Sequence, residues 1–438
     1  MLSFPSSTPA FSAFRSSRFA SEVAILLALI FFIPLFEAPK NLLLVAYAAT
    51  WVYNRYRAGW SANCGGRWDG WDTLFFVWIA SAYVLATFSG LHKNEWHGIG
   101  DLWRYVSLVW LLKRSGYGER EWKAIFAMIA VSTAIATLWA LIALLVPHKY
   151  QGIELHSVGH VNHSATYIAI SIGAVLSGLV AFWPTLSSRF RIGAIIALAL
   201  FAAGIVLAGS RAATLVTLVI IVLIGGLWSR KSKAVMLAIA VALAVFATSI
   251  QTFDKEMHRK NELAKLSANP MLNERYPMWN QALTAFRAHP WFGVGLDNFY
   301  DIDVATVKRW VGEQGGVYDP AAYAGSSHAH SLYMTTLAER GIVGLSIVLA
   351  VLSSWAVSLL RGWPRSSDPH VQWMLWGGAA SALIVTVAIG IVNTTLHHEH
   401  GLIAMLLLGA WLGSRTSAQR PASVVAERGQ SVSVDGAA

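Results

Sequence analysis

Apolar runs of roughly 20 residues recur along most of this chain, and they limit its fold more than any other feature. Each run is long enough to cross about 30 Å of hydrocarbon. In lipid such a segment must be helical, because every backbone N–H and C=O group needs a partner within the segment. Hydrophobic residues make up 55% of the chain and charged residues 13%, whereas soluble domains carry about 25% charged residues. The sequence therefore predicts an all-α, polytopic membrane protein.

The apolar runs predict about twelve transmembrane helices. The predicted spans are roughly 20–36, 40–53, 71–89, 97–112, 122–146, 164–183, 192–208, 212–228, 234–250, 331–360, 371–392 and 400–414. Arg15 and Arg18 precede the first run as they would in a signal peptide, but no small-residue cleavage site follows it. We therefore expect the first run to be a retained helix.

The basic residues gather in alternate loops, and this asymmetry sets the orientation. The loops that face inward when the N-terminus is inside carry Arg55, Arg57, Arg67, Lys113, Arg114, Arg120, Lys123, Arg189, Arg191, Arg230, Lys231, Lys233, Arg361 and Arg365. The short outer loops carry only Lys40, Lys93, Lys149 and Arg211. We expect both termini in the cytoplasm, and we attribute the net charge of +10 to membrane topology rather than to nucleic-acid binding.

The domain organisation follows from these spans. We expect transmembrane helices over residues 1–250, a large outer loop over 251–330, further transmembrane helices over 331–414 and a disordered cytoplasmic tail over 415–438. Cys64 is the only cysteine, so a disulfide within the chain and a cysteine-built metal cluster are both excluded.

The outer loop is longer than an ordinary connection, and such loops tend to be functional. We expect an amphipathic helix over 254–266, a helix that begins at Pro277 and ends at His289-Pro290, and another helix over 297–310. The loop is therefore partly helical.

The tenth predicted span opens at Ser326 or Ser327, since serine is a good N-cap. This start places His328 and His330 in the first helical turn, where residues two apart point to different faces. An imidazole titrates near pH 6.5 and accepts a proton at neutral pH, so His330 is the candidate general base. A surface histidine hydrated by water is the alternative.

Thirteen of the fourteen histidines fall in or near the outer loops, and only His370 is predicted to lie inside. One outer loop carries His156, His160 and His163, and another carries His397, His398 and His400. Such clustering allows a metal site, but the spacings match no familiar zinc signature. We interpret most of these histidines as a weakly basic interfacial surface and expect no metal.

Two outer arginines are candidates for binding a phosphate. Arg211 lies in the short Gly209-Ser210-Arg211 hairpin between two spans, and Arg275 precedes the Tyr-Pro pair of the long loop. A side chain that snorkels to water and an ordinary solvated charge are the respective alternatives. Guanidinium groups bind phosphate oxygens in a bidentate manner and stay charged, so the pair is suited to hold a pyrophosphate.

Two sequence blocks resemble the O-antigen ligase superfamily, which also contains O-antigen polymerases and protein O-oligosaccharyltransferases. The first is Arg275-Tyr-Pro-Met-Trp279 followed by Ala288-His-Pro-Trp-Phe-Gly-Val-Gly-Leu-Asp-Asn298. The second is His328-Ala-His330-Ser-Leu-Tyr-Met-Thr-Thr-Leu-Ala-Glu339-Arg-Gly341. The family pattern has Asn after the second histidine, whereas this chain has Ser331.

The resemblance implies a glycosyltransferase of the bacterial inner membrane with a periplasmic active site. The donor would be O-antigen on undecaprenyl pyrophosphate, and the acceptor a sugar hydroxyl of lipid A–core. Transfer would invert the anomeric centre without a metal or other cofactor. His330 would act as the base and Arg211 and Arg275 would hold the pyrophosphate, with His328, Arg287 and His163 as supporting residues.

Other functions remain open. Polymerases of the superfamily carry a glycine eleven residues after an outer-loop arginine, a pattern absent here, and protein-directed transferases carry a longer C-terminal soluble part. Both differences favour the ligase. A transporter of lipid-linked glycan is the alternative from another class. Transporters tend to place ionisable residues near the middle of the membrane. The predicted spans here are nearly free of charge, and Arg104, the main exception, lies near the start of its span.

Overall fold

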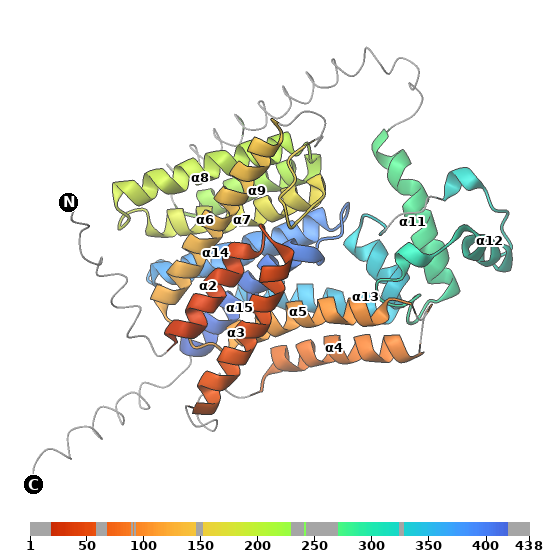
Figure 1. Cartoon of the computed structure of the whole chain (residues 1–438), viewed down its shortest axis with the longest axis horizontal. Helices are drawn as coiled ribbons and strands as arrows, with labels where there is room; N and C mark the ends of the chain where they lie inside the picture. The colour runs from red at the N-terminus through yellow and green to blue at the C-terminus, as the bar shows by residue number, and fades with distance from the viewer. Residues whose placement is uncertain are drawn as a thin grey trace, which may run out of the picture.

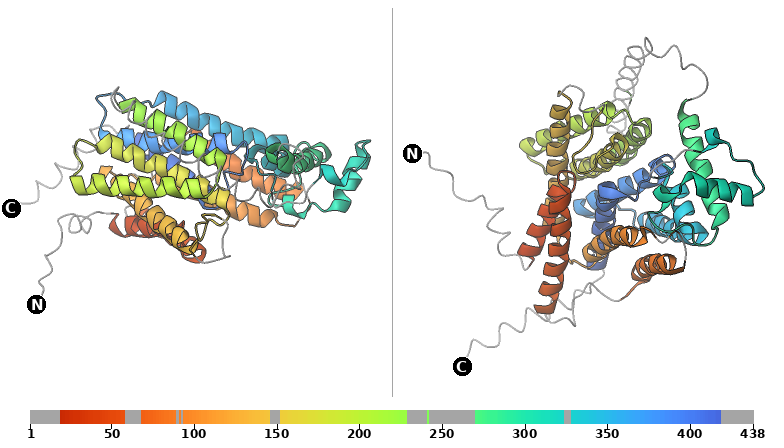
Figure 2. Two further views of the ribbon diagram at one scale, coloured as in Figure 1. Left: turned by 90° about the horizontal axis from the view of Figure 1, so that it is seen from above. Right: turned by 45° about the vertical axis from the view of Figure 1, so that its right-hand side comes forward.

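The computed structural model describes residues 19–57, 68–88, 91, 93–145, 152–228, 241, 270–323 and 328–418. Regular structure in these ranges is helical, apart from one isolated bridge between Leu155 and Gly159. The long helices lie side by side, and the green and teal helices of the large loop project beyond one end of the bundle (Figures 1 and 2).

The helices of the bundle are α2 (Ala20–Phe32), α3 (Glu37–Arg57), α4 (Gly70–Phe88), α5 (Glu95–Lys113), α6 (Glu119–Ala143), α7 (Val161–Phe182), α8 (Ser188–Leu207), α9 (Arg211–Trp228), α13 (Leu332–Arg361), α14 (His370–Ile389) and α15 (His398–Ala418). Each predicted span apart from 234–250, which lies outside the described residues, coincides with one of them. In the described part, α4, α6, α7, α8, α13 and α14 are long and apolar enough to cross a membrane, and α2 and α9 are shorter apolar helices. The architecture is that of a polytopic helical membrane protein.

The centre of the bundle is the contact between α7 and α14. A Cβ atom added at Gly173 would lie 2.1 Å from the Cβ atom of Ser381, and one added at Gly377 would lie 2.6 Å from that of Ser177. Small residues at these positions let the two helix backbones approach closely, as in other membrane bundles. The Ser177 hydroxyl also donates to the carbonyl of Met374 at 3.0 Å.

Buried ion pairs hold the helix ends on one side of the bundle. At the end of α5, Lys113 and Arg114 each lie 2.8 Å from the Asp72 carboxylate of α4. Arg55 of α3 pairs with the buried Glu22 of α2. Several basic residues that set the predicted orientation are thus paired and desolvated rather than loose in water.

Two helices of the outer loop differ from prediction. The helix expected from Pro277 begins at Pro270 and forms α11 (Pro270–Ala288), with Pro277 inside it. Proline fits the first turn of a helix, which suits Pro270. Pro277 lies inside the helix and costs one backbone hydrogen bond, which a helix tolerates when its packing compensates. The expected end before His289-Pro290 is confirmed.

The helix predicted over 297–310 is replaced by η1 (Phe299–Asp301) and α12 (Val304–Glu313). The Asp303 carboxylate accepts the Thr306 N–H at 2.7 Å and so caps α12. An aspartate N-cap starts a helix at the next residue, which explains the later start. A second short turn, η2 (Pro320–Ala322), follows, and the predicted helix over 254–266 lies outside the described residues.

Candidate functional site

The segment before α13 carries the two motif histidines, and it is not helical. Helix α13 begins at Leu332 rather than at Ser326 or Ser327, and the N-cap is Ser331, whose hydroxyl accepts the Met334 N–H at 3.4 Å. His330 has a φ of 45°, which only glycine adopts readily. The expectation that His330 lies in the first helical turn is therefore wrong, and Ser331 has a defined structural role.

Hydrogen bonds fix the backbone of this segment on three sides. The Trp279 indole of α11 donates to the Ala329 carbonyl at 3.0 Å, and the Ala329 N–H donates to the Thr335 hydroxyl at 3.1 Å. The Leu332 N–H donates to the carbonyls of Gly390 and Asn393 at 2.8 and 3.0 Å. The segment thus joins the outer-loop helix α11 to the loop between α14 and α15.

The two motif histidines lie against each other. The ring centroids of His328 and His330 are 4.4 Å apart, which contradicts the expectation that they point to different faces. That expectation assumed a helical backbone. The left-handed conformation of His330 instead brings its ring beside its neighbour.

The pair belongs to a cluster of seven histidines. Its members come from the start of α7, the segment before α13 and the start of α15. The centroid distances are 6.4 Å for His160–His330, 5.6 Å for His163–His328, 5.9 Å for His328–His397 and 5.1 Å for His163–His400. His398 lies 5.5 Å from His163. The two outer histidine groups seen in the sequence therefore meet in one place.

Burial and positive neighbours keep the motif histidines neutral. Burial lowers the pKa of His328 to about 3, and His330, His398 and His160 act in the same direction. The pKa of His330 is also lowered, first by burial, then by the positive charge of Arg275 and by His160, while Asn393 acts in the opposite direction. A neutral imidazole at neutral pH is the form that accepts a proton.

Arg275 lies on the side of α11 that faces the motif histidines. It is one helical turn before Trp279, whose indole bonds the residue next to His330, and residues four apart share a helix face. Its charge lowers the pKa of His330, which requires proximity. Two of the three residues predicted to form the site are thus brought together.

Arg211 begins α9 at the same end of the bundle. The Cβ position of Gly173 in α7 lies 3.5 Å from Ile220 of α9. The chain reverses direction between α7 and α8 and again between α8 and α9, so α7 and α9 run parallel. Counting nine residues back from each contact places Arg211 level with Ser164, next to His163. Its side chain is exposed there.

The supporting residues differ in their surroundings. His163 is buried within the histidine cluster, where it contacts five other histidine rings. Arg287 is exposed on the last turn of α11. His328 contacts His330 directly.

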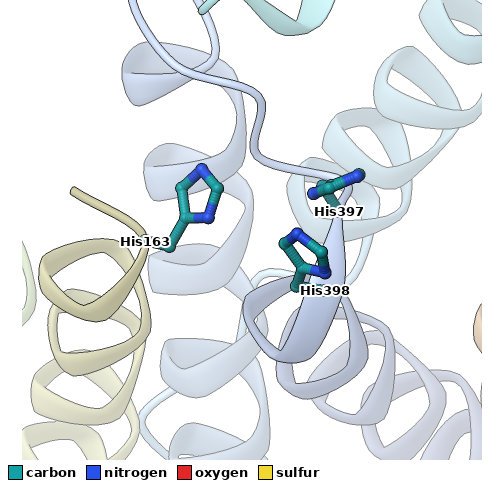
Figure 3. Close-up of side chains that lie close together, drawn as sticks. All are labelled: His163, His397 and His398. Carbon is teal, nitrogen blue, oxygen red and sulfur yellow. The ribbon is translucent and has the colours of Figure 1, made fainter. Parts of the chain in front are cut away.

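Three histidines of the cluster have the spacing that a metal ion requires. His163 lies at the start of α7, and His397 and His398 lie beside each other across from it at the start of α15 (Figure 3). One ring nitrogen of each lies within 4.8 Å of the others. The sequence spacing gave no sign of this arrangement, because His163 and the His397-His398 pair are brought together only by helix packing.

The two motif blocks meet at a break in α13. Gly341 has φ 61° and ψ −164°, which frees the preceding carbonyls, and the Val294 and Gly295 N–H groups donate to Ala338 and Glu339 at 2.9 Å. A Cβ atom added at Gly341 would lie 2.4 Å from the backbone of Trp291. The glycines of both blocks therefore build the junction between outer loop and bundle, a role that the sequence pattern did not assign.

A cavity of about 110 Å³ adjoins the histidines. Its lining includes Asp101, His328, Thr335, Glu339, Arg340 and His397. It is smaller than typical small-molecule sites of roughly 300–1,000 Å³.

The region that contains the candidate site residues matches a known protein family. The family model described as O-Antigen ligase matches residues 195–349, from within α8 to within α13, and includes Arg211, Arg275 and His330. A comparison with curated proteins found no match. Residues 195–349 thus form a domain that matches the O-antigen ligase family.

Proposed function

We propose that this protein is an O-antigen ligase that transfers O-antigen polysaccharide from undecaprenyl pyrophosphate to a sugar hydroxyl of lipid A–core. The observation that carries the proposal is the position of Arg275 on the face of α11 toward His330, from which its charge lowers the pKa of that imidazole. A base beside a permanent positive charge suits a reaction in which a hydroxyl loses a proton while a phosphate leaves.

His330 serves as the general base in this scheme. Its ring takes the proton from the acceptor hydroxyl as the oxygen forms a bond to the anomeric carbon of the donor. The bond from that carbon to the pyrophosphate oxygen breaks on the opposite face, so the anomeric configuration inverts. The fixed backbone around Ala329 holds the base in place while this happens.

Arg275 and Arg211 stabilise the departing pyrophosphate. Negative charge grows on its oxygens as the glycosidic bond of the donor breaks, and preorganised cations lower the energy of that state. Guanidinium groups provide this charge without a metal ion, as the family resemblance implies. The exposure of Arg211 at the start of α9 leaves it accessible to a lipid-linked substrate.

The proposed location is the bacterial inner membrane, with the site facing the periplasm and both termini in the cytoplasm. Helices α5 and α15 run parallel, since the Gly401 position contacts Tyr105 and the Gly409 position contacts Leu112. Lys113 and its carboxylate partners are thus separated from His398 by roughly 12 residues of helix, or about 18 Å. The positive charges and the histidine cluster lie at opposite ends, which supports this orientation.

Reconstitution in liposomes with a defined lipid-linked donor and lipid A–core tests the proposal. Wild type is expected to form the ligated product, and His330→Ala is expected to lose about 10²–10⁴-fold in rate because it lacks only the base. His289→Ala is the matched control and should retain the rate, because His289 lies outside the histidine cluster and packs against Trp310. Equal rates for wild type and His330→Ala would exclude His330 as the base.

The same assay separates the related functions. Elongation of the donor on itself, without transfer to lipid A–core, would identify a polymerase. Transfer to a peptide hydroxyl would identify a protein-directed transferase. Movement of the donor across the liposome membrane without formation of a glycosidic bond would identify a transporter.

A further inference from the structure

The histidine cluster contains more imidazole rings than the proposed reaction uses. The transfer scheme needs one base, yet His163, His397 and His398 form a separate group whose ligand atoms lie within 4.8 Å of one another. The ring centroids of His397 and His398 are only 3.7 Å apart. His163 is buried, His397 half-buried and His398 exposed, and such crowding of nitrogen donors suits a partner that accepts several lone pairs at once.

Two buried nitrogens of this region have no hydrogen-bond partner among the described residues. They are Nδ1 of His397 and Nδ1 of His400. Leaving a buried polar atom unsatisfied costs about 1–3 kcal/mol, so such atoms in a folded protein need an explanation. A bound cation would satisfy the nitrogen that ligates it.

The tautomer of His400 leaves its free nitrogen ready to bind a metal. The Nε2 atom lies 2.9 Å from the Thr394 carbonyl oxygen, and because a carbonyl only accepts, Nε2 must carry the hydrogen. The Nδ1 atom of the neutral ring then has an open lone pair. Metal-binding histidines commonly donate their other N–H to a carbonyl in this way.

The backbone at His398 is conformationally strained. His398 has a φ of 44°, a conformation that a residue with a Cβ atom rarely adopts. Strain of this kind amounts to about 1–3 kcal/mol and gathers at functional sites. Here it turns the His398 ring toward His163 at the start of α7 (Figure 3).

We propose that His163, His397 and His398 bind one divalent transition-metal ion of the zinc class, with His400 as the candidate fourth ligand. This inference departs from the sequence-based expectation that no metal is bound. Imidazole ligands suit zinc, copper, iron and nickel, whereas magnesium and calcium prefer oxygen. The Glu399 carboxylate lies between two of the ligands in the chain and contributes negative charge, shared with its partner Lys40.

The geometry needs little adjustment to hold an ion. Zinc lies about 2.1 Å from each imidazole nitrogen, so nitrogens around a tetrahedral ion lie about 3.4 Å apart. The observed limit of 4.8 Å therefore closes by side-chain movements on the order of 1 Å. The ion would tie the start of α7 to the loop before α15, and His330 is not among its ligands.

Metal binding is tested on full-length protein in detergent, purified through a tag that contains no histidine. Protein stripped with a chelator is titrated with Zn²⁺, and bound metal is measured by elemental analysis after desalting. Wild type is expected to hold one equivalent and to gain thermal stability on metal addition. Co²⁺ is expected to give visible absorption bands of nitrogen coordination in wild type.

The variants His163→Ala and His398→Gln are expected to fall to background metal content and to lose the metal-dependent rise in Tm. The glutamine keeps the side-chain bulk, so a folded variant is obtained even if an alanine disrupts packing. His156→Ala is the matched control, because this histidine lies in the same outer loop but contacts the Leu35 carbonyl, and it should keep one equivalent.

Wild type without bound Zn²⁺ or Co²⁺, or ligand variants that bind as much as wild type, would overturn the metal site. Because metal content is measured without any glycan transfer, its failure leaves the proposed function untouched. Failure of transfer in the liposome assay likewise leaves the metal site standing.

Discussion

The ability of His330 to accept a proton depends on the charges around its imidazole. Burial and Arg275 lower its pKa, and the neighbouring histidines His160 and His328 add no negative charge that would raise it. The proposed base is neutral above its pKa, so we expect its activity to persist below the ordinary histidine value of about 6.5. The residue is thus set to remain a base across the neutral range.

Removing the positive charge of Arg275 is expected to move the pH dependence of transfer. Arg275→Gln lets the pKa of His330 rise, so the acidic limb of the pH–rate profile shifts to higher pH, whatever the loss in overall rate. Profiles of kcat/KM from pH 5 to 8 measure the shift. Arg309→Gln, on the exposed face of α12, is the control and should leave the limb in place. An unchanged limb in Arg275→Gln would show that the two groups are not coupled.

Lysine should replace the two arginines poorly. Arg211→Lys and Arg275→Lys keep the positive charge but lose the planar, bidentate grip on phosphate oxygens. We expect each to fall well below wild type, with alanine variants losing about 10²–10³-fold in rate. Initial rates in the liposome assay measure both. Full activity of both lysine variants would refute a bidentate pyrophosphate clamp.

Single residues show where prediction from sequence stops. His330 and Arg275 were candidates by residue type and position, and the family resemblance gave them matching roles, but their closeness followed from neither composition nor spacing. The pairing of His328 with His330 was predicted wrongly, because a helix start was assigned to serines and the left-handed backbone at His330 leaves no mark in the sequence. Local propensity cannot show that hydrogen bonds with α11 and with the loop after α14 hold a segment out of the helix.

At the scale of elements, the apolar helices were predictable and the loop elements were not. Membrane helices follow from long apolar runs, and each predicted span within the described residues coincides with a helix. The outer-loop helices depend on caps and on tertiary contacts. Asp303 caps α12 through its own side chain. The sequence contains this residue, but other polar residues nearby are equally good N-caps, so the start of the helix could not be chosen.

The junction at Gly341 predicts a specific effect on stability. Gly341→Ala adds a Cβ atom at φ 61° and 2.4 Å from the Trp291 backbone, so strain of about 1–3 kcal/mol combines with a clash that no side-chain rotation relieves. We expect a lower Tm and a loss of transfer, since the outer loop no longer seats on α13. Thermal unfolding in detergent and the transfer assay measure the two effects.

Gly315→Ala separates strain from clash. Gly315 also has a positive φ of 77°, but nothing lies within 4 Å of its Cβ position. It should cost roughly 1–2 kcal/mol from backbone conformation alone and leave transfer intact. If Gly341→Ala is no more destabilising than Gly315→Ala, the close contact between α13 and the outer loop is not maintained in solution.

At the scale of the whole molecule, charge and chemistry are separated along the bundle. Helix α13 links the two ends: it starts beside the motif histidines and ends at Arg361, and its part after the break at Gly341 spans about 30 Å. The buried ion pairs of Arg55 and Lys113 hold one end, and the histidine cluster with the outer loop occupies the other. This polarity is what a protein needs when its substrates reach it from one face of the membrane.

The separation predicts which residues an impermeant thiol reagent reaches from outside the cell. Cys64 is the only cysteine, so Cys64→Ser gives a background without thiols. In that background Val317→Cys, at a position 95% exposed in the outer loop, should react in intact spheroplasts. Arg361→Cys, exposed at the far end of α13, should react only after the membrane is opened. Mass shifts of the labelled protein report both reactions. Labelling of both positions from the same side would mean that α13 does not cross the membrane, and the periplasmic placement of the histidines would lose its physical basis.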